Sequence, residues 1–286
     1  MDNKFLNFFE TLTPEILSPK DYIDWNNVKE KIKKIRREIA LLESLDKDNP
    51  KEDLADLLNK NPKILKVLQL LIAHTPDVIY FDDKSKYINF EKDILIVEKN
   101  KERAYQIAQI FIEMGLVEFL KEVKSIEDIV KGVLLGLEPN VRKNRRGKKL
   151  ELIINFLIKD VVEKLKDDLH INLSYQSQMF VDLPNERKQI DYVILKDNVP
   201  KVAIEVNFYS TSGSKPSEVL ERAYPNLQSN LKNKNIGFIA ITDGLGWEKM
   251  KQVIKTAFNK IDYLLNIKQA NSGLLKKYIS ELINKP

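Results

Sequence analysis

The segment Pro200–Ser210 reads PKVAIEVNFYS, and its alternation of side chains is typical of a β-strand. Successive side chains of a strand point to opposite faces of the sheet, so Glu205 and Asn207 share one face. The other face is apolar and consists of Val202, Ile204, Val206 and Phe208. A carboxylate on such a strand is costly to bury unless it is paired or binds a metal. The segment therefore predicts a sheet that carries polar chemistry at one strand end.

A second apolar segment, Ile190–Ile194, comes shortly before this strand and carries Asp191. The connection Lys196–Val199 is short enough to make the two strands antiparallel neighbours. In the right register, Asp191 and Glu205 come within reach of one cation. A salt bridge at the solvent edge of the sheet is the alternative, and it explains Glu205 alone equally well.

The residue types present restrict the kind of metal that this pair can hold. The 286 residues include no cysteine and only two histidines, His74 and His170, which lie far apart in the sequence. Disulfides, thiolate sites and a histidine zinc cluster are therefore not expected. A metal at Asp191 and Glu205 would be bound through oxygen, and we expect Mg²⁺. Phosphodiester hydrolysis uses such an ion to stabilise transition-state charge and to lower the pKa of the attacking water.

A third acid, Glu151, lies at the start of a helix predicted from Lys149 to Leu169. Its apolar stripe includes Ile154, Ile158, Val161 and Leu165. This stripe directs Glu151 roughly toward the sheet. Glutamates also occur in the first turn of a helix because they complement the helix dipole, so a catalytic role for Glu151 needs other support.

Six of the eight residues from Arg142 to Lys149 (RKNRRGKK) are basic. The net charge of the chain is only +5, so any electrostatic footprint for nucleic acid must be local. The run adjoins the candidate metal site, where it would neutralise phosphates. The residues expected to contact DNA are Arg142, Lys143, Asn144 and Arg145. A merely solvated loop is the alternative.

Two further turns flank the candidate strands. The polar loop Ser210–Lys215 follows the Glu205 strand and leads into a helix. Its candidate phosphate or base contacts are Ser212, Ser214 and Lys215. A plain turn explains this loop equally well. The segment Thr242–Trp247 (TDGLGW) is predicted to be a strand-to-helix turn, with Trp247 in the core.

The overall pattern predicts a mainly helical region over residues 1–130, followed by an α/β core over residues 131–286. Predicted helices span 27–45, from 61 onward, 101–120, 126–137, 149–169, 216–231 with a kink at Pro225, and 247–265; predicted strands span 171–181, 189–195, 201–208 and 236–242, with a hairpin of 78–81 and 87–97 around residues 82–86. No apolar stretch is long enough to span a membrane, and the first fifteen residues lack the apolar core of a cleavable leader. We therefore expect a cytoplasmic protein.

Four segments, in this order along the chain, resemble the DpnII and MboI family of type II restriction endonucleases. They are GLEPNVRKNRRGKKLE (136–151), QIDYVI (189–194), IEVNFYSTSGSKPSE (204–218) and ITDGLGW (241–247). The resemblance covers most of the chain and is weakest before about residue 90. It implies the restriction-endonuclease-like PD-(D/E)xK fold, a mixed sheet flanked by helices. It also implies Mg²⁺-dependent cleavage of double-stranded DNA at GATC on the 5′ side of the G, blocked by methylation from a partner methyltransferase.

The resemblance also implies roles for particular residues. The family's helix acid falls on Glu151, and its two strand acids fall on Asp191 and Glu205. The position that is usually lysine in the wider fold is Asn207, which can orient a water but supplies no positive charge. The metal, or a lysine such as Lys188 or Lys201, must then lower the pKa of the water.

A palindromic target that is cut on both strands predicts a two-fold homodimer. A repair or recombination nuclease of the same fold is the nearest alternative, and it would recognise a DNA structure in place of a sequence. A DNA-binding module that has lost catalysis is the alternative from another class. Retention of all three acids argues against that module.

Overall fold

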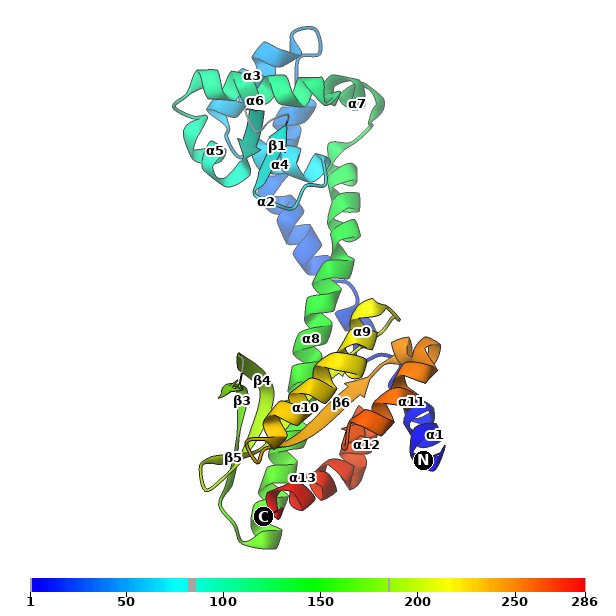
Figure 1. Ribbon diagram of the computed structural model, residues 1–286. Coiled ribbons are helices and arrows are strands. Elements are labelled where there is room, and N and C mark those ends of the chain that lie inside the picture. Colours follow the sequence, from blue (N-terminus) through cyan, green and yellow to red (C-terminus); the bar gives the residue numbers. More distant parts are fainter. Residues whose placement is uncertain (1, 82–85, 185, 286) are drawn as a thin grey trace. The chain divides into compact units, whose positions relative to one another are not determined.

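The computed structural model describes residues 2–81, 86–184 and 186–285, and Figure 1 traces their helices and strands. The chain forms two compact units. The sheet unit comprises Met1–Pro19 and Asn144–Pro286, and the helical unit comprises Lys20–Lys143. The division falls within the long helix α8 (Ile126–Leu169). The sequence predicts a boundary between two domains at residues 130 and 131. The compact units do not test whether the two parts are separate domains, so this boundary stays a prediction.

The sheet unit contains one five-stranded mixed sheet in the order β3-β4-β5-β6-β7. Its strands are β3 (Leu173–Asp182), β4 (Arg187–Lys196), β5 (Val199–Phe208), β6 (Gly237–Asp243) and β7 (Leu264–Leu265). Strands β3, β4 and β5 are antiparallel, whereas β5, β6 and β7 are parallel. Strand β5 is therefore central and joins the two halves. The predicted mixed α/β architecture is confirmed.

Helices cover both faces of this sheet (Figure 1). On one face, buried apolar residues of β5 such as Val202 and Ile204 pack with Ile154 and Ile158 of α8 and with helix α13 (Leu275–Ile283). On the other face, Ala203 belongs to a second cluster of buried side chains. Helices that contribute to that cluster include α1 (Asp2–Glu10), α10 (Tyr224–Lys232) and α11 (Lys251–Lys260). The two faces of β5 thus follow the predicted alternation.

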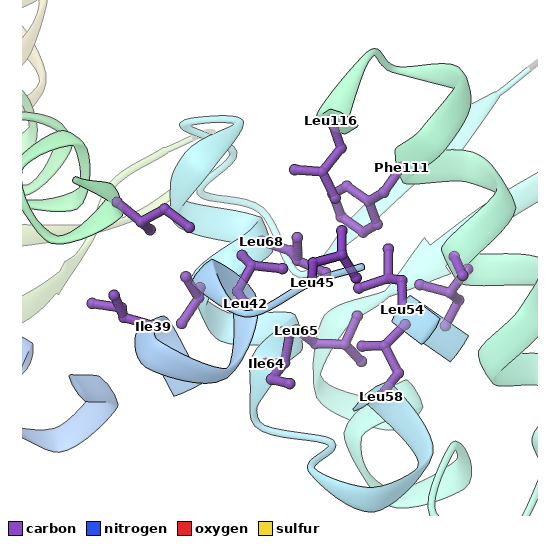
Figure 2. Packing of buried hydrophobic residues seen from close by; sticks show 14 of the residues in the cluster. Ile39, Leu42, Leu45, Leu54, Leu58, Ile64, Leu65, Leu68, Phe111 and Leu116 are labelled. Atoms are coloured by element: carbon purple, nitrogen blue, oxygen red, sulfur yellow. The ribbon is translucent and has the colours of Figure 1, made fainter. Parts of the chain in front are cut away.

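The helical unit has its own apolar core, shown in Figure 2. Its elements before α8 are η1 (Pro19–Asp21), α2 (Trp25–Glu43), α3 (Pro50–Lys60), α4 (Ile64–Leu71), β1 (Val78–Phe81), β2 (Lys86–Asn89), α5 (Phe90–Ile96), α6 (Lys101–Glu113) and α7 (Leu116–Glu122). Asp24 caps α2 by accepting a hydrogen bond from the Asn27 backbone N–H at 2.9 Å. The predicted hairpin is present as β1 and β2, and residues 82–85 of its turn lie outside the described residues. Across the described ranges, no helix is both long and apolar enough to cross a membrane.

Four local predictions are wrong, each for a physical reason. The strand predicted to Val97 ends at Asn89, which caps α5 by accepting a bond from the Lys92 N–H. The helix predicted over 101–120 breaks at Gly115, which adopts a left-handed conformation with φ of 84°. The helix predicted over 247–265 is the 3₁₀ helix η3 (Leu245–Met250), α11 and strand β7. The two helices predicted over 126–137 and 149–169 are one, because α8 continues through the basic run between them.

Asp243, at the end of β6, joins three distant parts of the sheet unit. Its buried carboxylate accepts hydrogen bonds from the Thr13 N–H and hydroxyl, both at 2.7 Å, and from the Gly244 N–H at 2.6 Å and the Ile267 N–H at 3.0 Å. Four donors satisfy a carboxylate that water does not reach. The contact fixes Thr13 beside the turn that follows β6. Trp247 in this turn is fully buried, as predicted.

Gly244 has no room for a side chain. Its φ is 105°, and a Cβ atom would lie 2.3 Å from the carbonyl oxygen of Tyr209. We expect Gly244→Ala to lower the free energy of unfolding by about 2 kcal/mol or more, because the backbone of one of the two segments must move. Urea denaturation measures this change. The matched control is Gly147→Ala in α8, where a Cβ meets nothing within 4 Å and should be neutral or stabilising. Equal stability of the two variants would contradict the expected clash.

Candidate active site

Asp191 lies on β4 next to Glu205 on β5. The antiparallel ladder pairs Tyr192 with Ile204, and one step further along each strand brings the two acids together. Asp191 Oδ2 accepts a hydrogen bond from the Val206 N–H at 2.9 Å, which ties the carboxylate to the strand that carries Glu205. The structure thus brings the two predicted strand acids together.

The other oxygen of Asp191 has a partner that the sequence did not reveal. Gln178 Nε2 donates to Asp191 Oδ1 at 3.3 Å. Gln178 lies on β3 with a φ of 52°, a conformation that is uncommon for any residue other than glycine. The ladder between β3 and β4 omits the pair of Gln178 and Asp191. This local irregularity directs the Gln178 amide toward Asp191. No pattern in the sequence predicts it.

Glu205 is largely removed from water, and one of its carboxylate oxygens is unsatisfied. Oε1 is buried without a hydrogen-bond partner among the described residues. Burial, and to a smaller extent the negative charge of Asp191, raise the pKa of Glu205 to about 7, while Lys188 acts weakly in the opposite direction. A buried carboxylate oxygen without a hydrogen-bond partner is strongly stabilised by binding a cation or a proton. Lys201 has no comparable effect on Glu205.

Asn207 shares the face of β5 with Glu205, as predicted, and its amide is held by a tyrosine. Asn207 Nδ2 donates a short hydrogen bond to the hydroxyl of Tyr224. Tyr224 is buried at the start of α10 and packs edge-on against Phe238, with ring centroids 5.4 Å apart. Tyr224 was not among the predicted site residues.

Glu151 is exposed on α8 and lines a cleft of about 320 Å³ together with Asp191 and Gln178. The hydroxyl of Tyr192, in the same cleft, donates to the backbone carbonyl of Glu151 at 3.1 Å. Burial, followed by the charges of Glu151 and Asp191, raises the pKa of Tyr192 to about 12. Glu151 therefore shares a cleft with Asp191. Within the described ranges, no three acidic or histidine side chains are grouped closely enough to form a ready metal cage.

The basic run occupies the middle of α8, and its members differ in what they contact. Arg142 lies over the ring of Tyr22 at 4.7 Å within the helical unit, whose last residue is Lys143. Asn144 and Arg145 belong to the sheet unit. In that unit Arg146 forms a two-pronged ion pair with Glu15, at 2.6 and 3.0 Å, and this pairing lowers the pKa of Glu15 to about 2. Arg146 thus anchors the N-terminal segment.

The predicted contact loop after β5 is exposed. Ser212 precedes helix α9 (Ser214–Glu218), which begins with Ser214 and Lys215, and all three side chains face solvent. The backbone of Tyr209 and Thr211 packs against the turn at Gly244 and Gly246. The contacts with DNA expected for this loop stay predictions.

The sequence profile described as DpnII restriction endonuclease matches residues 4–277. The chain is 33% identical to the type II restriction enzyme DpnII of Streptococcus pneumoniae, in an alignment that covers 95% of this chain and 97% of that protein. It is 32% identical to the type II restriction enzyme MjaIII of Methanocaldococcus jannaschii, over 91% and 93%. Identity to the type II restriction enzyme MboI of Moraxella bovis is 26%, over 96% and 99%. The predicted enzyme class, a site-specific deoxyribonuclease, is confirmed, and the chain belongs to the DpnII restriction endonuclease family.

Proposed function

We propose that this chain is a Mg²⁺-dependent endonuclease that hydrolyses double-stranded DNA at GATC on the 5′ side of the G. One observation carries the proposal: Asp191 and Glu205 lie on adjacent strands, and Glu205 Oε1 is buried without a partner. Type II restriction endonucleases generally need a divalent metal. Carboxylate oxygens are the ligands that Mg²⁺ prefers.

The acids fit such an ion. Asp191 and Glu205 would hold it, and Glu151 would support a metal or a water from α8. When bound, the ion supplies charge stabilisation for the phosphorane-like transition state and a lowered pKa for water. The hydrogen bonds from Val206 and Gln178 orient Asp191, as partners of metal ligands commonly do.

Asn207 would orient the attacking water through its amide. Attack in line with the leaving 3′ oxygen produces a 5′ phosphate and a 3′ hydroxyl. The wider fold has a lysine at this position, and Lys188 is the better substitute of the two lysines named above, because its charge acts on Glu205.

Recognition would use the basic run and the loop after β5. The proposed contacts with phosphates or bases are Arg142, Lys143, Asn144, Arg145, Ser212, Ser214 and Lys215. A palindromic site cut on both strands calls for a homodimer with one active site per half. A methyltransferase of the same specificity would protect the DNA of the cell, and both enzymes would work in the cytoplasm.

Digestion of methylated and unmethylated plasmid with Mg²⁺, followed by sequencing of the ends, tests this function. We expect discrete fragments that begin at GATC from unmethylated DNA alone. Asp191→Ala and Glu205→Ala should bind the same DNA without cutting it, since each removes a metal ligand. Cleavage that depends on junctions or flaps would favour a repair nuclease, and binding without any cleavage by the wild type would favour an inactive module.

The raised pKa of Glu205 predicts a pH-dependent stability. Without metal, the folded protein keeps the Glu205 proton up to pH about 7, whereas the unfolded chain releases it near 4.5. The folded state holds the extra proton between these values, so the free energy of unfolding falls as pH rises through this window. Glu205→Gln should be more stable than the wild type above pH 7, by up to about 3 kcal/mol, and equally stable below pH 4.5.

Urea denaturation in EDTA across this pH range measures the difference. The matched control is Glu248→Gln, which removes an exposed carboxylate of the same unit and should leave the wild-type pH profile intact. A Glu205→Gln variant that kept the wild-type slope would contradict the assignment.

Replacing Arg142, Lys143 and Arg145 together with alanine should weaken DNA binding and flatten its dependence on salt. Each residue that neutralises a phosphate contributes roughly 0.9 to the slope of log K against log salt, so up to roughly 2.7 should be lost. Binding titrations with Ca²⁺ in place of Mg²⁺ measure the slope. The control replaces Lys159, Lys164 and Lys166, three exposed lysines of the same helix. An equal loss in both triple variants would show a general effect of net charge and would contradict a specific DNA contact.

A further inference from the structure

Asn207 carries a side-chain amide, whose two ends have opposite hydrogen-bonding character. Its nitrogen donates to the Tyr224 hydroxyl, and no hydrogen bond from another described residue ends on its oxygen. The two ends of an amide are distinguished only by their partners. With its nitrogen on the Tyr224 hydroxyl, Asn207 leaves its oxygen for the active site.

We propose that Tyr224 is a positioning residue for catalysis, which holds the Asn207 nitrogen so that Asn207 Oδ1 is presented to the attacking water or to the ion. The inference rests on the proposed role of Asn207. An oxygen in this place accepts a hydrogen bond from water or binds a cation, whereas the N–H groups of an amide nitrogen would face the cation with their positive ends.

The backbone around Tyr224 is shaped to bring this ring to Asn207. The preceding turn is the π-helix η2 (Val219–Ala223), and the Tyr224 N–H donates to the Val219 carbonyl. A π-turn inserts one extra residue into a helix, which rotates the following side chains by about 100° around the helix axis. Pro225 follows directly. It has no backbone N–H, so the change of helical pitch leaves no hydrogen-bond donor unpaired at this position. The rotation places Tyr224 in the apolar cluster on the Glu205 face of the sheet.

If Tyr224 had a purely structural role, any hydrogen-bond donor or acceptor in the core could be the partner of its hydroxyl. Its actual partner lies two residues from Glu205 on the same face of β5. Burial is the main cause of a strongly raised pKa for Tyr224, and Glu205 is the next.

Tyr224→Phe removes only the hydroxyl. We expect the rate constant for single-turnover cleavage of a GATC duplex to fall about 10- to 100-fold. A loss of this size is common when the partner of an active-site ligand is removed. DNA affinity and thermal stability should stay near those of the wild type. The matched control is Tyr278→Phe in α13, a buried tyrosine that packs edge-on against Tyr263 and lies on the other face of the sheet. Its cleavage rate should be that of the wild type.

A double-mutant cycle with Asn207→Ala separates positioning from packing. If Tyr224 acts through Asn207, adding Tyr224→Phe to Asn207→Ala should cost little further activity. Full additivity of the two losses, or a wild-type rate for Tyr224→Phe, would overturn the proposal. In both outcomes the wild type still cuts, so the proposed function stands.

NMR of selectively labelled asparagine side chains gives a readout that does not depend on cleavage. Asn207→Asp removes one pair of amide signals and so assigns it. Tyr224→Phe should shift this pair toward the position of amides that are bonded to water, whereas Tyr278→Phe should leave it in place. An unmoved Asn207 signal in Tyr224→Phe would also overturn the proposal.

Discussion

The carboxylate of Glu205, on the central strand, is largely shielded from water, and this burial sets how readily it ionises. Strand β5 is flanked by β4 and β6 and covered by helices on both faces, so its middle residues, Val202–Ile204, are buried and Oε1 of the adjacent Glu205 is shielded from solvent. A carboxylate in such a place is costly to ionise, and the negative charge of Asp191 adds to the cost. A divalent cation removes both penalties at once. The burial that makes the ionised carboxylate costly would therefore strengthen the binding of the proposed ion.

Much of the fold could be predicted from the sequence because strands repeat with a period of two. Val202 and Ile204 on one side, and Glu205 and Asn207 on the other, are enough to orient β5. The short connection to β4 then brings Asp191 alongside. Both features depend on residues that are close together in the sequence, and such features can be predicted from a residue pattern.

The parts that the sequence did not reveal depend on contacts that are distant or on unusual backbone. Tyr224 reaches Asn207 only because a π-turn rotates it, and Gln178 reaches Asp191 through a left-handed residue inside a strand. Neither conformation has a residue signature. The basic run contains Asn144 and Gly147, which favour a turn, yet it is helical because the apolar residues that follow it are packed against the sheet.

The bonds between Thr13 and Asp243 span 230 positions of the chain, and they have a consequence for synthesis on the ribosome. Residues 2–19 emerge before the helical unit, whereas their partners in the sheet unit emerge only after the whole helical unit has been made. Domains tend to fold as they are completed, so the helical unit can fold while the early segment still waits. A nascent chain therefore has no assembled pair of strand acids until synthesis is well advanced, and the proposed active site forms late.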